Sequence, residues 1–283
     1  MEAYVSRGNA FLDYGNPEGI KAAQADYERA LLLKPTYLPA RINLAYSLQM
    51  SGKFQQAWTQ FTIAIQQDQL CQAAYEGRAI VNLQMSNLFA ALQDVNASMK
   101  VKASAELHTN RGVVSLFMKD STGAMHDFQA AIKLDNRYSL AYFNAANIYF
   151  KNRQFRQAIE YYNRSIQFNN KDESAYVNRA IARAVIKDSS GALSDFSKAI
   201  SISPKSAHVY FNRGNLYSTL GEWQKAADDF SHGLRLQPDD PLAHKRRADA
   251  LGKLGMKEKA IADYQYAVQL QARIKFLKSI HSK

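Results

Sequence analysis

Cysteine, proline and long apolar runs are scarce in this sequence of 283 residues. The single cysteine, Cys71, excludes an intramolecular disulfide and fits a small apolar residue in a reducing compartment. No apolar run approaches the roughly 18 residues that a membrane-spanning helix needs. The opening residues MEAYVSRGNAF contain neither a basic segment nor an apolar one, so they do not form a secretory signal. We therefore expect a cytoplasmic protein without a membrane span.

The motifs of common catalytic and cofactor sites are missing as well. The sequence has no GxxxxGK[ST], no GxGxxG after a strand, and no strand pattern. Its six histidines lie far apart, without HExxH or another metal-ligand spacing. The lone cysteine has no histidine within a few residues, which gives nucleophilic catalysis little support. We predict no enzyme activity, no metal site and no cofactor.

What the sequence does contain is a repeat. The stretch AHVYFNRGNLYSTLGEWQKAADDFSHGLRLQP, residues 207–238, holds two helix-length segments separated at Gly221. Gly214 is small where the second helix would approach, and Phe230 would fill the space beside it. Neither segment buries its apolar stripe alone, so the unit needs copies of itself. Aligning the small residues gives eight units: 1–37, 38–71, 72–104, 105–138, 139–172, 173–206, 207–240 and 241–274.

Two columns recur in the second segment of every unit. The first column is alanine: Ala23, Ala57, Ala91, Ala124, Ala158, Ala192, Ala226 and Ala260. Four residues later stand Tyr27, Phe61, Val95, Phe128, Tyr162, Phe196, Phe230 and Tyr264. This pattern resembles the tetratricopeptide repeat family, whose helix–turn–helix units stack into a right-handed superhelical solenoid. The resemblance implies an all-α protein, with one solenoid domain over residues 1–274 and a basic helical extension over 275–283 that caps the last unit.

Charged residues recur in pairs. Six units carry arginine at the seventh position of the first segment and aspartate at a matching place in the second: Arg7 with Asp26, Arg78 with Asp94, Arg111 with Asp127, Arg179 with Asp195, Arg213 with Asp229, and Arg247 with Asp263. The other two units lack both residues. A guanidinium among packed helices needs a carboxylate partner, because a buried lone charge costs several kcal/mol. We predict helix-to-helix ion pairs with a structural role.

Asparagine recurs at the sixth position of the first segments, although it is a poor residue inside a helix. The resemblance implies that the first helices line a concave face and that this position points into it. The sixth-position asparagines are Asn43, Asn110, Asn144, Asn178 and Asn212, and the ninth position adds Asn147 and Asn215. Such amides could hold a peptide backbone, as in the asparagine ladder of O-linked N-acetylglucosamine transferase, which the column resembles. Alternatively, they bond water or the adjacent repeat.

Apolar and basic residues complete the predicted concave face. Phe143, Ile181 and Phe211 would select apolar side chains, and Lys245 and Arg246 make the last unit basic. Residues 241–283 contain ten Lys or Arg and three Asp or Glu, which gives +7 of the net +11. A partner segment with one acidic end would fit. No aromatics alternate with the cations, so we expect no nucleic-acid binding.

These observations favour a non-catalytic, monomeric scaffold or adaptor that binds a protein or an extended peptide. The chaperone-binding members of the family use a clamp of lysine, arginine and asparagine, but Phe143, His208 and Asn212 stand where that clamp needs cations. Two alternatives stay open. The chain could be the substrate-recognition part of a larger enzyme such as a glycosyltransferase, or a self-assembling structural element. A ciliary role is a family-level expectation only.

Overall fold

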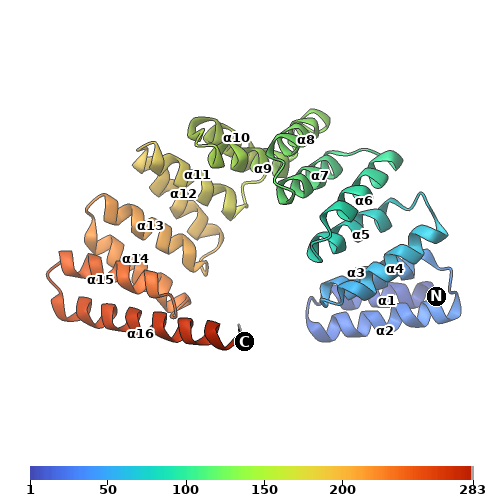
Figure 1. The fold of residues 1–283 in the computed structure, drawn as a ribbon, viewed down its shortest axis with the longest axis horizontal. Coiled ribbons are helices and arrows are strands. Elements are labelled where there is room, and N and C mark those ends of the chain that lie inside the picture. The colour runs from blue at the N-terminus through green and yellow to red at the C-terminus, as the bar shows by residue number, and fades with distance from the viewer. Residues whose placement is uncertain (282–283) are drawn as a thin grey trace. The chain divides into compact units, whose positions relative to one another are not determined.

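The computed structural model describes residues 1–281, and these form sixteen α-helices and no strand (Figure 1). The helices come in eight pairs, one pair for each repeat unit. They divide between two compact units, one from Met1 to Ala141 and the other from Tyr142 onward. The boundary between the two compact units falls near the start of α9.

The helix bounds follow the repeat. The first unit contains α1 (Glu2–Asp13), α2 (Pro17–Leu33), α3 (Leu38–Met50), α4 (Phe54–Gln67), α5 (Gln72–Gln84), α6 (Leu88–Val101), α7 (Ala105–Phe117) and α8 (Ser121–Leu134). After α9 (Ser139–Lys151), which crosses the boundary, come α10 (Phe155–Phe168), α11 (Glu173–Val185), α12 (Ser189–Ile202), α13 (Ala207–Thr219), α14 (Trp223–Leu236), α15 (Pro241–Lys253) and α16 (Lys257–His281). Odd-numbered helices are therefore the first helices of the repeats, and even-numbered helices are the second.

The turn inside each pair is tight and needs one residue in the left-handed region. Glycine supplies it in half of the pairs, at Gly15, Gly52, Gly221 and Gly255. In the other half a residue with a side chain takes a positive φ, at Ser86, Lys119, Arg153 and Lys187. In several repeats the second helix then begins at a polar capping residue. Asn16, for example, accepts a hydrogen bond from the Gly19 amide at 2.7 Å, and Pro17 occupies the first turn.

The core of each repeat is built on the contact between a small side chain on the first helix and a large one on the second. A Cβ added at Gly8 would lie 2.6 Å from the Tyr27 ring, and one at Gly112 would lie 2.6 Å from the Phe128 ring. The aromatic side chains of this column are almost fully buried, with Tyr264 on α16 as the exception. The helices can approach closely only because the first-helix position is small, as the sequence predicted.

The C-terminal helix is longer than its counterparts. α16 has 25 residues, whereas α14 has 14. Of the predicted C-terminal extension, residues 275–281 are helical and continue α16 in the same direction instead of folding back over the last unit, and residues 282–283 lie outside the described residues. The apolar side of α16 consequently stays open, and Val268 is 66% exposed.

Candidate peptide-binding site

The six arginine–aspartate pairs form a framework that holds the first helices in place. In every pair the arginine Nε and Nη2 atoms donate to the two carboxylate oxygens of the aspartate. Arg213 has both distances to Asp229 at 2.8 Å, and that hydrogen bonding raises the pKa of the guanidinium above its ordinary value. The aspartates are buried. Each pair thus joins the two helices of one repeat.

The third arginine nitrogen reaches the repeat before it. In five of the pairs Nη1 donates to the residue that follows the aromatic column in the preceding second helix: Arg78 to Thr62, Arg111 to Asn96, Arg179 to Asn163, Arg213 to Ser197 and Arg247 to Ser231. The distances run from 2.7 to 3.2 Å. Sequence reasoning missed this link, because the acceptor changes among three residue types.

The two repeats without the ion pair use other contacts. In the second repeat Arg41 is only 9% exposed, and its Nη1 donates to Gln60 at 2.8 Å instead of to a carboxylate. Burial lowers the pKa of this guanidinium. In the fifth repeat Tyr161 packs its ring against those of Tyr142 and Tyr149, with centroids 6.0 and 4.9 Å away. Aromatic packing replaces the ion pair there.

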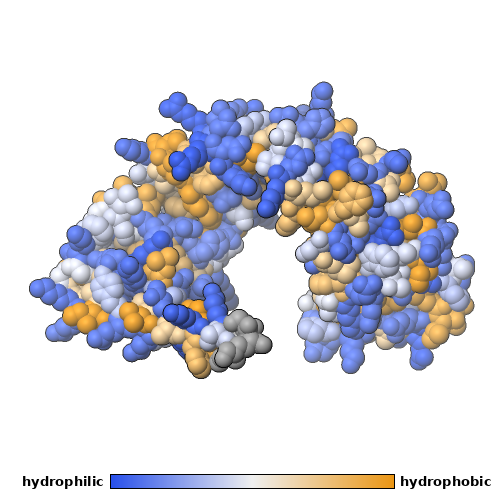
Figure 2. Space-filling model, viewed as in Figure 1, coloured by the Kyte–Doolittle hydropathy of each residue, from blue (hydrophilic) through white to orange (hydrophobic). Residues whose placement is uncertain are grey.

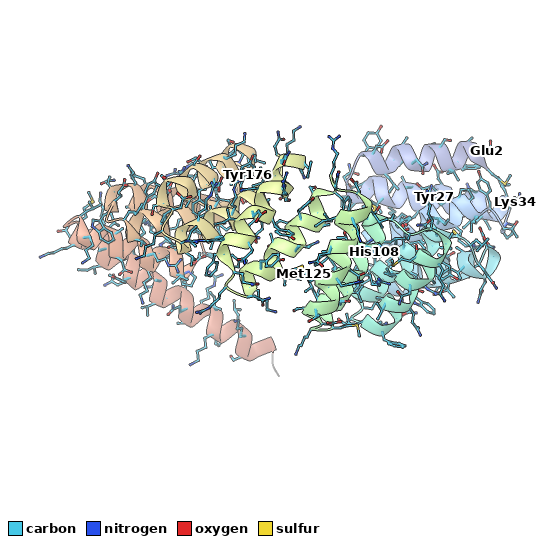
Figure 3. The ribbon with its side chains drawn as sticks, turned by 90° about the horizontal axis from the view of Figure 1, so that it is seen from above. Glu2, Tyr27, Lys34, His108, Met125 and Tyr176 are labelled. Atoms are coloured by element: carbon cyan, nitrogen blue, oxygen red, sulfur yellow. The ribbon has the colours of Figure 1, made fainter. Side chains whose placement is uncertain are left out.

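The predicted asparagine column divides into two classes. Asn43 Nδ2 donates to Asn9 Oδ1 in the preceding repeat at 2.9 Å, and the Tyr27 hydroxyl donates to the same oxygen at 2.7 Å. Tyr27 lies on α2 in the first unit (Figure 3). Asn178 and the Tyr162 hydroxyl bond Asn147 Oδ1 in the same manner, at 3.0 and 2.6 Å. We call Asn43 and Asn178 the bridging asparagines, since each links two repeats.

The other three sixth-position asparagines, which we call the unbridged asparagines, are Asn110, Asn144 and Asn212. Within the described residues their side chains make no hydrogen bond. For Asn110 and Asn212 the reason is the ninth position of the preceding repeat, which holds Ile80 and Ile181 and offers no acceptor. Asn215 differs again, because it stands at the ninth position and is itself the acceptor. The aromatic residue of its own repeat is Phe230, which lacks the hydroxyl that Tyr27 and Tyr162 donate in theirs.

In the second unit the unbridged Asn212 lies beside an apolar cavity. The cavity has a volume of about 300 Å³. Its lining comes from α11, α12 and α13: Ile181, Ala184, Val185, Phe196, Asn212, Asn215, Leu216 and Thr219. Two carboxamides thus border a space that suits an apolar side chain, and both are open to solvent in part.

The first unit has a cavity at the same register, between α5 and α7. Ile80, Leu83, Asn110 and Val113 line it at the positions of Ile181, Ala184, Asn212 and Asn215. Its volume is only about 50 Å³. Leucine in place of alanine accounts for part of the difference, because the larger side chain fills the space.

The remaining predicted contact residues fall into separate groups. Ile181 lines the cavity, whereas Phe143 packs against the Tyr162 ring at 6.0 Å and Phe211 lies against Gly233 in the core of its repeat. Lys245 is exposed and Arg246 half-buried on α15. Sequence reasoning named Phe196 only as a packing residue of the repeat and did not single out Ala184 or Leu216. Counting positions ten and twelve of the first helix would have found Leu216 and Ala184.

Comparison with known proteins agrees with the repeat architecture. Residues 139–172 and 207–240 each match a family model described as "Tetratricopeptide repeat". Those two segments are thus similar to tetratricopeptide repeats, and the eight helix pairs of the described residues have the same helix–turn–helix architecture. In the described residues no helix has the length and apolar character needed to cross a lipid bilayer.

Among relatives, the chain is 54% identical over 165 residues to human Tetratricopeptide repeat protein 6. That alignment covers 58% of this chain and 32% of the relative, so the chain spans about a third of the relative's length. DnaJ homolog subfamily C member 7 of Mus musculus is 34% identical to this chain over 64 residues. That alignment covers 23% of this chain and 13% of the relative.

Two solved structures share the fold. A tetratricopeptide repeat protein from Parabacteroides merdae has a TM-score of 0.64 at 19% identity, covering 88% of this chain and 98% of its own. The structure titled "Crystal structure of APC/C hetero-tetramer Cut9-Hcn1" gives 0.68 at 14% identity, covering 85% of this chain and 50% of its own.

Proposed function

We propose that this protein is a non-catalytic scaffold that binds an extended peptide segment of a partner along its first helices. The observation that supports this most is the cavity of about 300 Å³ beside Asn212 and Asn215. A carboxamide both donates and accepts, so it can pair with a peptide group of any sequence. The apolar lining beside it accepts one side chain of the peptide. The arrangement combines backbone recognition with a preference for an apolar residue.

The division of the asparagines narrows the candidate contacts. Asn43 and Asn178 each donate one N–H to the preceding repeat, so part of their hydrogen-bonding capacity holds repeats together. The unbridged asparagines have donors and acceptors left for a ligand. Lys245 and Arg246 follow in the next repeat after Asn215, and their charge favours a peptide with an acidic residue at that end. The proposed contact set is therefore smaller than the full asparagine column.

A displayed peptide library, selected on the intact chain, supplies a probe even though the natural partner is unidentified. We expect selected peptides to share an apolar residue and to bind Ala184→Leu at least about tenfold more weakly, a change of about 1.4 kcal/mol. The substitution imitates Leu83 and fills the cavity. Asn212→Ala should weaken binding similarly. The matched control is Asn43→Ala, the same change at the same position in a repeat whose asparagine is bridging, which should retain full affinity.

Binding is measured by fluorescence anisotropy, with circular dichroism to show that each variant is folded. If no peptide is enriched, or if the Ala184→Leu and Asn212→Ala variants bind as well as the unmodified protein, the cavity is not a peptide site. Equal losses in Asn43→Ala and Asn212→Ala would also count against the proposal, since they would indicate a general effect on the fold.

A further inference from the structure

The small cavity of the first unit differs from the larger cavity of the second unit by a charged side chain in its wall. Glu76 lines the small cavity together with Ile80 and Asn110. In the second unit the residue at the same position of the repeat is Val177, which is apolar and 4% exposed. The two cavities thus lie at the same register, but of the two linings only that between α5 and α7 contains a carboxylate.

The Glu76 carboxylate is held in place without an ion pair. Its Oε1 accepts hydrogen bonds from Gln72 Nε2 at 2.9 Å and from Ser98 Oγ at 3.2 Å. Its Oε2 accepts no hydrogen bond from the described residues, and the side chain is half-buried. The carboxylate is therefore oriented by its own repeat, and one oxygen remains for a donor that a ligand brings.

The four complete first helices of the first unit offer Glu76 no free cation. α1, α3, α5 and α7 contain no lysine, and their four arginines are Arg7, Arg41, Arg78 and Arg111. Three of these arginines belong to the arginine–aspartate pairs, and the fourth is buried. The acidic residues of the same helices are Glu2, Asp13, Glu76 and Glu106, and none of them forms an ion pair with a described residue. This set of helices therefore carries uncompensated negative charge.

The negative charge also acts on a neighbouring tyrosine. Tyr46 on α3 donates a hydrogen bond to the Ala73 carbonyl at 3.0 Å. Burial is the largest cause of the rise in the pKa of its hydroxyl from 10.0 to about 12, and Glu76, Cys71 and Glu106 add to that rise. Two unpaired carboxylates thus act on the same part of the first unit, between α3 and α7.

Apolar side chains beside Glu76 suit the stem of a long basic side chain. Ile80 stands one helical turn after Glu76 on α5 and is 40% exposed, and Val113 on α7 lines the cavity with it. Because Leu83 fills much of the cavity, its volume of about 50 Å³ leaves little room for a side chain to enter. A ligand side chain must lie across the mouth instead. The methylene stem of lysine or arginine packs in this way while the charged end reaches a partner.

The same face also offers contacts to the residues around a basic side chain. Asn110 is one of the unbridged asparagines and borders the cavity, so its amide remains available to a peptide backbone. Further along α7, Phe117 is 63% exposed, and Figure 2 shows hydrophobic side chains at the surface over this helix. An apolar residue of the ligand finds a contact there.

We propose that the face formed by α5 and α7 is a second binding site, for a peptide segment of a partner protein that carries a lysine or arginine next to an apolar residue. The charged end of the basic residue pairs with Glu76, and its stem lies on Ile80 and Val113. Charge decides the occupant, because an acidic segment of the kind proposed for the second unit would be repelled by the carboxylates here. The two units therefore select segments of opposite charge.

A displayed peptide library selected on the intact Ala184→Leu chain tests this site, because that substitution fills the cavity of the second unit and leaves the first unit unchanged. Selected peptides should be enriched in lysine or arginine beside an apolar residue. In fluorescence anisotropy they should bind a chain that also carries Glu76→Gln about tenfold more weakly, as expected for the loss of one hydrogen bond to a charged group. Glutamine keeps an acceptor for Gln72 and Ser98, and circular dichroism shows whether the fold is retained.

The matched control is Glu28→Gln, the same substitution at an exposed position on α2, which should bind the selected peptides as well as the Ala184→Leu parent does. Binding should also weaken as the sodium chloride concentration rises, because the proposed ion pair is partly exposed. A second variant, Glu76→Val with Leu83→Ala, gives the first unit the residues that stand at these positions in the second. It should lose the basic peptides even though its cavity is larger.

Three results would overturn the proposal. They are a selection that enriches no peptide, selected peptides without an excess of basic residues, and equal affinities for the Glu76→Gln and Glu28→Gln variants. Since Ala184→Leu is present throughout, none of these results depends on whether the cavity of the second unit binds peptide. Failure of the proposed function and failure of this second site are therefore distinguishable.

Discussion

Removing the carboxylate from one internal ion pair tests the central structural argument. Asp229 is 7% exposed and accepts two hydrogen bonds from Arg213, whose side chain is 19% exposed. In Asp229→Ala the guanidinium keeps its bond to Ser197 and its place near the Tyr210 ring, but it loses its counter-charge in a largely dry site. Breaking a buried pair from one side costs about 3–5 kcal/mol. We expect about 3 kcal/mol, since Ser197 and residual water stabilise the freed charge.

The matched control is Asp228→Ala, the same substitution one residue earlier on the exposed side of α14, where the side chain bonds only Gln224. It should cost less than about 0.5 kcal/mol, as surface substitutions generally do. Urea unfolding followed by circular dichroism in the far ultraviolet measures both. Replacing both partners, as Arg213→Met with Asp229→Leu, should recover most of the loss, because no unpaired charge remains. Equal midpoints for Asp229→Ala and Asp228→Ala would refute the reasoning.

Two further predictions concern single side chains. Gln60→Glu gives the buried Arg41 a carboxylate and should raise the free energy of unfolding by about 1 kcal/mol, whereas the exposed Gln56→Glu on the same helix should change it little; urea unfolding measures both. Burial and neighbouring carboxylates raise the pKa of Tyr27 to about 12 from 10.0. The folded state therefore keeps the Tyr27 hydroxyl proton up to a higher pH than the unfolded state does. The stability that the protonated hydroxyl contributes is lost as the pH rises from about 10 to 12. Ultraviolet absorbance of the tyrosinate should show that Tyr27→Phe removes a late-titrating tyrosine; an unchanged curve would contradict the assignment.

The repeat period made the helix pairs and their packing predictable from the sequence. Gly214 opposite Phe230, and aspartate present only where arginine is present, are correlations at fixed offsets, and they report contacts inside one repeat. Contacts between repeats were harder to infer. The acceptors of arginine Nη1 alternate among threonine, asparagine and serine, so no single residue type marks the link, although the hydrogen-bonding capacity is the same.

The asparagine column shows why a sequence pattern alone could not assign the binding site. Asn178 and Asn212 occupy the same position in consecutive repeats, yet Asn147 precedes one and Ile181 precedes the other. The neighbour decides whether the amide bonds the adjacent repeat or remains available to a ligand. A residue in a repeat protein therefore has a role only in combination with the repeat before it.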